Sequence, residues 1–208
     1  MNNISLFLDT SSFIQIGLLN EDQEWAAYEL IKNKKGSQVL HSLIYELLIK
    51  HNLSIKDIKR LIVANGPGSY TGIRLAEGFA QILELENIEV INFYHYEAPF
   101  FAGKNNYGFV ANAFKGETFS YTFNATEEET MKLLSSEEFD NFKSSEEIYH
   151  IGEEVNGKSF QSLYRLYEDE PSRIFSKVIQ REARTEPFYF RPLEKEFKPS
   201  ILRTTTSE

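Results

Sequence analysis

Cysteine is absent from this chain of 208 residues, and basic residues are scarce. Without cysteine, the protein has no disulfide bond, thiol nucleophile, thiolate-bound zinc or iron–sulfur cluster. The 22 Lys and Arg residues stand against 31 Asp and Glu residues, a formal net charge of −9. Proteins that bind nucleic acid or an anionic membrane unaided usually present a basic face. We therefore expect this chain to bind neither by itself.

Long apolar runs are also missing. No run approaches the ~20 residues that a membrane-spanning helix needs. The apolar run from Ile4 to Leu8 is cut by Asp9 and follows no basic residue, so it does not predict a signal peptide. The last residues, 204–208, carry no lipidation motif. These features predict a cytoplasmic protein without a membrane partner.

The first half of the chain has the pattern of an α/β layer. Hydrophobic residues make up 41% of the chain, enough for a core, and 17 Phe and 11 Tyr favour packed strands. Turn residues separate three consecutive apolar segments, which predict an antiparallel meander, and helical spacing follows. The predicted strands are 4–8, 13–19, 25–31, 61–64 and 90–93, and the predicted helices are 37–52 and 73–86.

The pattern becomes less regular near residue 103, which we take as the boundary between a lobe 1–102 and a smaller lobe 103–208. Residues 109–111 and 118–123 predict a strand pair, and 148–151 a further strand. Residues 126–147 are rich in acidic residues and predict a solvated, partly helical surface segment. Helical character returns at 160–166 and 176–183.

Two loops could bind phosphate. Gly66, Gly68, Ser69, Thr71 and Gly72 lie between a strand and a helix, where exposed N–H groups attract anions. The segment lacks the lysine of a Walker A loop. A tight strand-to-helix crossover, with Ser69 or Thr71 as helix N-cap, is the alternative that composition favours.

The second such loop follows the first strand. Asp9, Ser11 and Ser12 form a turn whose carboxylate and hydroxyls could hold Mg²⁺ and a phosphate. The alternative is an Asx-type turn, in which the aspartate bonds only to nearby backbone.

Metal and hydrolase sites find little support. A helical His pair needs His at i and i+4, but His41 is followed by Tyr45. His51, His95 and His150 have no ligand cluster of metal spacing near them, and the chain has no G-x-S-x-G motif. We therefore expect no metal, no cofactor and no Ser-His-Asp triad.

The helix at 37–52 has an unusually broad apolar arc. Val39, Leu40, Leu43, Ile44 and Leu47 repeat at helical spacing. Tyr45 and Ile49 lie outside that stripe. The extra apolar surface could pack within the chain, which the pattern alone favours, or against another chain.

Several of these segments resemble the TsaB (YeaZ) family. The most specific is Gly66-Pro67-Gly68-Ser69-Tyr70-Thr71-Gly72-Ile73-Arg74. The hairpin at 8–12, His41 and the segment 186–192 support it. The resemblance is strong over residues 4–93 and thin thereafter. It implies an actin-like ATPase (ribonuclease H-like) fold with two related lobes, the second reduced.

The resemblance also implies a function. The family helps to make N6-threonylcarbamoyladenosine (t6A) in tRNA as a non-catalytic subunit that binds the catalytic paralogue TsaD, with the ATPase TsaE joining the assembly. It contacts tRNA only indirectly, and forms homodimers in isolation. The two helices at 37–51 and 71–86 would form the interface. The implied interface residues are Val39, Leu40, Leu43, Ile44, Leu47, Ile73, Arg74, Glu77 and Gln81.

The same resemblance leaves two questions open. A nucleotide at the subunit joint would lie near Asp9 and the glycine loop. A rival interpretation is a stand-alone enzyme of the same fold, an ATP-dependent kinase or a glycoprotease-like hydrolase. The second lobe also departs from the family pattern, with Asn112-Ala113-Phe114 in place of Asp-Ala-Arg and Gly152-Glu153-Glu154 in place of glycine-acid-glycine.

Overall fold

The computed structural model describes residues 3–32, 36–113, 116–126, 129–142, 147–155, 157–158 and 160–190. Three parts of the motifs above, Phe114, Arg191 and Pro192, lie outside the described residues. The side chain of Ser37, which could cap the first helix, also lies outside the described part.

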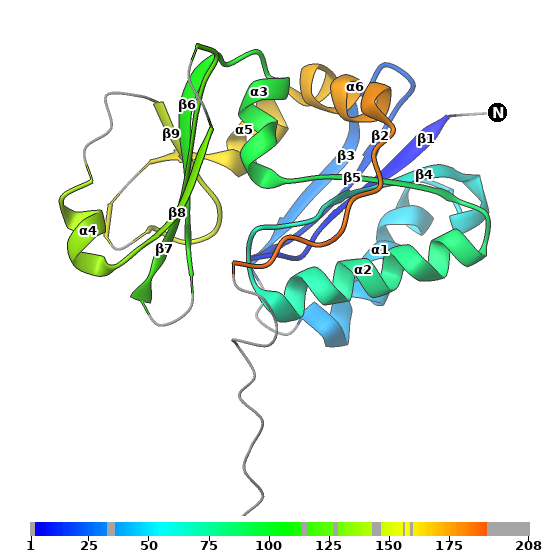
Figure 1. The fold of residues 1–208 in the computed structure, drawn as a ribbon. Coiled ribbons are helices and arrows are strands. Elements are labelled where there is room, and N and C mark those ends of the chain that lie inside the picture. Colours follow the sequence, from blue (N-terminus) through cyan, green and yellow to red (C-terminus); the bar gives the residue numbers. More distant parts are fainter. Residues whose placement is uncertain are drawn as a thin grey trace, which may run out of the picture.

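The first half of the chain forms a five-stranded sheet in the order β3-β2-β1-β4-β5 (Figure 1). Strands β1 to β3 pair antiparallel, as the predicted meander requires, and β4 and β5 continue the sheet in parallel from β1. The elements are β1 Ile4–Asp9, β2 Ile14–Leu19, β3 Trp25–Ile31, α1 Gly36–Lys50, the 3-10 turn η1 Ile55–Asp57, β4 Ile58–Ala64, α2 Tyr70–Leu85 and β5 Glu89–Phe93.

Both faces of this sheet are buried, which explains the continuous apolar strands. Because successive side chains of a strand point to opposite faces, Leu6 and Leu8 pack beneath α1 and α2. Phe7 points to the other face, where it joins an aromatic core shared with the second half of the chain. The helix pair α1/α2 therefore covers one face, and the second half covers the other.

The second half forms another five-stranded sheet, in the order β10-β9-β6-β7-β8. The turn η2 His95–Glu97 and α3 Ala98–Phe101 lead into it, and it contains β6 Asn106–Asn112, β7 Thr118–Asn124, β8 Thr130–Leu134, α4 Ser136–Asp140, β9 Glu147–His150 and β10 Gln161–Ser162. Strands β6 to β8 are an antiparallel meander, and β9 and β10 add in parallel from β6. The second sheet thus repeats the topology of the first. This confirms the expected actin-like fold of two related lobes, the second reduced at α4, β9 and β10.

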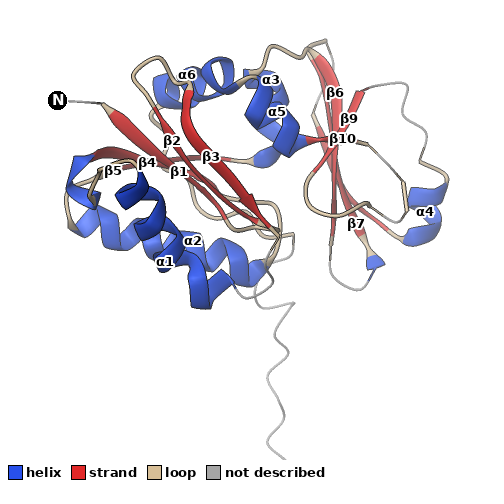
Figure 2. Cartoon of the chain, turned by 180° about the vertical axis from the view of Figure 1, so that it is seen from behind, coloured by secondary structure: helices blue, strands red, loops and turns tan. Residues whose placement is uncertain are grey.

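The end of the described chain returns to the first sheet. Helix α5 Leu163–Asp169 follows β10, and α6 Pro171–Arg181 lies over the first sheet, on the face away from α1 and α2 (Figure 2). The ring of Phe175 in α6 is fully buried, 5.1 Å from the ring of Phe7. The segment after residue 163 therefore packs with the first lobe in space. The boundary near residue 103 stays a prediction about the sequence.

The prediction for residues 126–147 was partly wrong. Residues 136–140 are helical, as expected, but Thr130–Leu134 is the edge strand β8, paired with β7. An edge strand with mostly exposed side chains resembles a surface segment in sequence. Helices α5 and α6 also begin and end at residues other than those predicted. No helix of the described residues is long and apolar enough to cross a membrane.

Candidate functional site

The loop after β1 is buried and internally bonded. Asp9 is fully buried, and one of its carboxylate oxygens accepts a hydrogen bond from the backbone N–H of Ser11 at 2.8 Å, which is the predicted Asx turn. Its other oxygen accepts from the side-chain amide of Gln15 at 2.6 Å. Burial, and then the charge of Asp9, raises the pKa of Tyr28, whose hydroxyl donates to Gln15. Both oxygens of the Asp9 carboxylate therefore accept hydrogen bonds from groups of the protein itself.

Ser11 and His95 form a contact that the sequence did not predict. The hydroxyl of Ser11 lies 2.7 Å from Nε2 of His95, and Nδ1 of His95 lies 2.9 Å from the hydroxyl of Tyr167. Asp9 also approaches Nε2, at 3.6 Å. In a Ser-His-Asp triad the acid holds Nδ1, opposite the serine, whereas here acid and serine share one nitrogen. The geometry is that of a buried polar network joining three distant segments.

The glycine loop is the joint between α2 and the loop after β1. Ser69 is the N-cap of α2, as the crossover interpretation predicted, with its hydroxyl accepting from the N–H of Gly72. A Cβ on Gly72 would lie 1.8 Å from the carbonyl oxygen of Thr10, and a Cβ on Gly68 would lie 2.6 Å from Cβ of Ser11. These glycines are needed because the two loops touch backbone to backbone.

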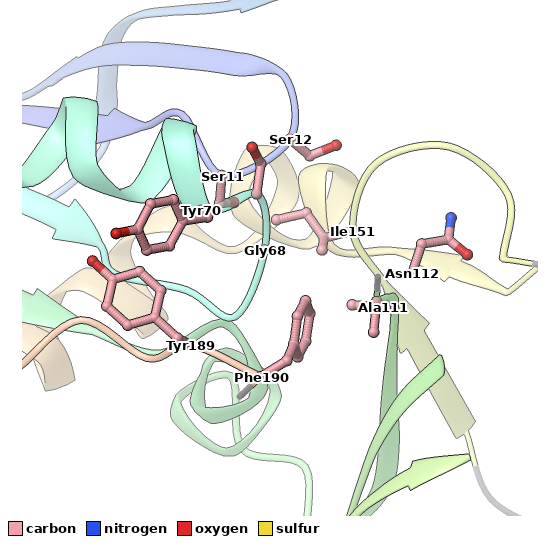
Figure 3. Close-up of a pocket in the computed structure, with 11 residues that line it drawn as sticks. Ser11, Ser12, Gly68, Tyr70, Ala111, Asn112, Ile151, Tyr189 and Phe190 are labelled. Atoms are coloured by element: carbon pink, nitrogen blue, oxygen red, sulfur yellow. The ribbon is translucent and has the colours of Figure 1, made fainter. Parts of the chain in front are cut away.

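A cavity of about 360 Å³ lies between the lobes at this joint (Figure 3). It is lined by Ser11, Ser12, Gly68, Ser69, Tyr70, Ala111, Asn112, Ala113, Ile151, Tyr189 and Phe190. Part of the cleft is filled by the chain's own C-terminal segment. The ring of Tyr189 packs 5.0 Å from that of Tyr70, and the ring of Phe190 lies 5.3 Å from that of Phe119. The volume left is at the small end of the range for ligand pockets.

Of the residues predicted near a nucleotide, Ser11, Ser12, Gly68 and Ser69 line this cavity. Asp9 lies behind them with its bonds satisfied inside the protein. Gly66, Thr71 and Gly72 belong to the joint rather than to the cavity lining. Nucleotide binding here stays a prediction. Among the described residues, no group of three His, Asp or Glu side chains could hold a metal ion.

Four of the nine predicted interface residues are buried within the chain. The structure buries Leu40, Ile44 and Leu47 in the core beneath the helices. Ile73 is buried as well, so these four side chains offer no surface to a partner. Val39 and Leu43 are half-buried against the same core. The apolar stripe that the sequence shows is the face that covers the sheet, as expected for any amphipathic helix.

The outer surface of the helix pair nevertheless carries large apolar side chains. Tyr45 and Ile49 on α1 are 66% and 55% exposed, and Ile82 and Leu85 on α2 are 53% and 83% exposed. We call these four residues the helix-pair face. Arg74 and Gln81, two further predicted interface residues, are also exposed on α2. The sequence signalled the α1 part of this face, because Tyr45 and Ile49 lie outside the buried stripe; it gave no such signal for Ile82 and Leu85 on α2.

Glu77 has a partner that the sequence did not predict. The guanidinium of Arg184 bonds both carboxylate oxygens of Glu77, at 2.7 and 2.9 Å, and the carboxylate of Glu84. Burial opposes the ionised form of Glu77, but the hydrogen bonds and charge of Arg184 outweigh it and lower the pKa of Glu77. The pairing fixes the segment around Arg184 along α2.

Comparison with known sequences identifies relatives of one pathway. The family model described as "TsaD: tRNA N6-adenosine threonylcarbamoyltransferase" matches residues 31–187. The tRNA threonylcarbamoyladenosine biosynthesis protein TsaB of Bacillus subtilis is 35% identical over 79 residues, 38% of this chain and 34% of that protein. TsaB of Escherichia coli is 32% identical over 81 residues, 38% of this chain and 35% of that protein. The matches thus span about a third of these curated relatives.

Comparison with solved structures supports the fold. A Pseudomonas aeruginosa protein described as uncharacterized with similarity to peptidase YEAZ superposes with a TM-score of 0.61 at 17% identity, covering 91% of this chain and 100% of that one. YeaZ from the same organism gives 0.60 at 17% identity, covering 90% and 99%. At such identity, the likeness concerns the fold alone.

Proposed function

The chain belongs to the family described as TsaD: tRNA N6-adenosine threonylcarbamoyltransferase, and from that membership we propose that it is a TsaB-type subunit in the synthesis of t6A in tRNA. Its task is to bind and activate a catalytic TsaD-like paralogue in the cytoplasm. A TsaE-like ATPase joins the assembly, and tRNA is contacted through the partners. The curated TsaB relatives support this role over a stand-alone kinase or glycoprotease-like hydrolase.

The observation that carries the proposal is the helix-pair face. Its four apolar side chains are each more than half exposed, on the two helices that cover the first sheet. Exposed apolar patches on a protein surface mark interaction sites. A second helix pair laid against it would form a four-helix contact, and a stable pair of this kind buries ~1,600 Å² in total. In isolation the same face serves a homodimer.

The cleft supports a non-catalytic role. A carboxylate that binds Mg²⁺ must offer its oxygens to the ion. Here the carboxylate of Asp9 bonds Gln15 and the Ser11 backbone instead. Tyr189 and Phe190 occupy part of the space between the lobes. Both features favour a protein that acts through its surface.

A charge on the helix-pair face tests the proposal. We expect Leu85→Glu to abolish co-purification with the TsaD protein of the same organism, because a carboxylate would be buried without a partner. The chain alone should then elute as a monomer in size-exclusion chromatography. Met131→Glu, an equal change at a 44% exposed residue of β8, is the control and should leave both unchanged. If the Leu85→Glu variant binds TsaD as tightly as the unaltered chain does, the helix-pair face is not the interface with TsaD.

Calorimetric titration of the purified chain with Mg-ATP and with zinc tests the non-catalytic role separately. We expect no tight binding and no turnover by the chain alone, and t6A formation only after TsaD and TsaE are added. Hydrolysis of ATP or modification of tRNA by the isolated chain at a useful rate would overturn the proposal.

A further inference from the structure

A second cavity, of about 350 Å³, lies away from both the interlobe cleft and the helix-pair face. It opens between the segment 94–101, which links the two sheets, and strands β6 and β7. We call it the aromatic pocket. Its lining residues are Tyr94, Tyr96, Glu97, Phe100, Phe101, Tyr107, Tyr121, Phe123, Glu129 and Arg181. Seven of these ten residues are aromatic, whereas the interlobe cleft mixes serines, glycines and alanines with its aromatics.

The rings form the floor and the rim of this pocket. Tyr107 and Tyr121 are almost fully buried, and the ring of Tyr96 packs 4.5 Å from that of Tyr121. At the rim, Phe100 is 50% exposed and stands edge-on to Phe123, with ring centres 5.3 Å apart. The face of an aromatic ring carries partial negative charge, so a set of such rings attracts cations.

The charged residues of the aromatic pocket add to this field. The guanidinium of Arg181 pairs with the carboxylate of Glu97 and lies 5.2 Å from the ring centre of Phe101. The pocket thus already holds one cation between a carboxylate and a ring. Among the ion pairs of the described residues, none involves Glu129. One negative charge is therefore left over in a pocket of two carboxylates and one guanidinium.

The tyrosines respond to that charge. Burial, and then the charge and the hydrogen bond of the Glu129 carboxylate, raise the pKa of Tyr121. The same field disfavours any anionic ligand, so phosphate groups and nucleotides do not suit the aromatic pocket. A cation is the ligand that its rings and its unpaired carboxylate would both stabilise.

We propose that the aromatic pocket binds an alkylammonium cation, with the ammonium head against the rings of Tyr96, Phe100 and Tyr121 and opposite the carboxylate of Glu129. The volume exceeds that of a methylated ammonium head, so it leaves room for the chain attached to it. The head group belongs either to a free small molecule or to a methylated lysine side chain. The site lies outside the helix-pair face and does not depend on the proposed partner.

Choline and its neutral carbon isostere, 3,3-dimethylbutan-1-ol, test the proposal on the unaltered protein. The two probes have nearly the same shape and differ in charge. We expect saturable shifts of the amide resonances of residues 94–101 and 121–123 with choline, at a dissociation constant of ~1 mM or below. The isostere should bind at least about fivefold more weakly, the effect of one cation–π contact. Equal binding of both probes would show that the pocket recognises only apolar shape and not charge, which would overturn the proposal.

Two variants identify the groups responsible. Glu129→Gln removes the unpaired charge, and Phe100→Leu removes a rim ring while keeping an apolar side chain. Each should weaken choline binding about fivefold or more. Glu137→Gln, which removes a charge from the exposed helix α4, is the control and should bind as the unaltered protein does. Both pocket residues lie at the surface, and an unchanged amide spectrum outside the pocket shows that each variant is folded.

A peptide with trimethyllysine distinguishes the two sources of the cation. Tighter binding of this peptide than of choline, at the same resonances and sensitive to Glu129→Gln, assigns the site to a protein side chain. Tighter binding of choline assigns it to a free small molecule. If neither choline nor the trimethyllysine peptide shifts these resonances up to ~10 mM, the proposal is wrong.

Discussion

The two lobes share one strand order and are built differently. In the first, helices α1 and α2, of 15 and 16 residues, connect the parallel strands and cover a whole face of the sheet. In the second, the corresponding connection before β9 contains α4 of 5 residues, and β10 has only 2 residues. The second sheet instead shares one hydrophobic core with the first sheet, and residues of η2, α3, α5 and α6 take part in that core. The first lobe contains a complete helix layer, while the second depends on shared elements.

Glycines show the same difference. On the first lobe, an added Cβ at Gly66 would lie 2.6 Å from the carbonyl oxygen of Phe188, and one at Gly72 would lie 1.8 Å from that of Thr10. On the second lobe, Gly103 and Gly157 have positive φ but nothing within 4 Å of an added Cβ. Gly66 and Gly72 thus allow tertiary contacts, whereas Gly103 and Gly157 allow turns. Gly152 of the second lobe combines a positive φ with a close approach to Ser12. A contact constrains a residue more tightly than a turn, because Asn or Asp can also occupy left-handed turns.

The largest effect that tests this comparison is expected at the shared core. Phe175→Ala should lower the free energy of unfolding by about 4 kcal/mol, because the ring is fully buried in the core that the two sheets share. The single tryptophan, Trp25, lies 5.2 Å from Phe175 and reports unfolding in urea by fluorescence. Phe142→Ala, at a half-buried ring of the small second-lobe cluster, should cost clearly less. Equal losses would show that the shared core is not the main support.

The next largest effect is expected from alanine substitutions at two glycines of α2, one in a tertiary contact and one without. Gly72→Ala should destabilise the protein by about 3 kcal/mol, since the new methyl group overlaps the Thr10 backbone. Gly78→Ala, on the same helix with nothing within 4 Å, should instead stabilise it by about 0.5–1 kcal/mol. Urea unfolding measures both. A tolerated alanine at Gly72 would contradict the role of the joint.

An alanine substitution at a second-lobe glycine should destabilise the protein less than Gly72→Ala does. Gly103→Ala meets no atom, so its cost of about 1 kcal/mol comes only from the left-handed backbone. Gly103→Asn, which tolerates that backbone, should recover part of the loss. A loss as large as that of Gly72→Ala would remove the distinction between the two kinds of glycine.

The smallest effect is expected at the surface of α2. Arg184→Gln removes the ion pairs with Glu77 and Glu84, and should lower the free energy of unfolding by about 1 kcal/mol or less. Because the pKa of Glu77 is lowered from 4.5, its contribution is complete above pH 4.5 and is lost as pH falls through the folded-state pKa. The difference between Arg184→Gln and the unaltered protein should therefore shrink below pH 4.5. A constant difference down to pH 2 would contradict the assignment to Glu77.

The first lobe could be predicted well because its signals are local. The meander, both helices and the N-cap at Ser69 follow from alternation, helical spacing and turn residues within a few positions. The edge strand β8 was missed because pairing with β7, rather than its own residues, makes it a strand. The predicted start of helix α6 lay too far along the chain, at residue 176. The helix begins at Pro171, ahead of its apolar residues.

The site was less predictable, since its contacts join distant residues. Burial of Leu40 and exposure of Tyr45 depend on which arc of α1 covers the sheet. A broad apolar arc does not reveal that choice. The network of Ser11, His95 and Tyr167 and the pairing of Arg184 with Glu77 join residues 72 to 107 positions apart. No sequence pattern of this length signals them.

The position of Tyr189 and Phe190 between the lobes has a consequence for motion. Closure of two lobes about a cleft needs free space between them. Here these two side chains take part of that space and pack against rings of both lobes. We therefore expect the two lobes to keep one relative position rather than to close over a small molecule.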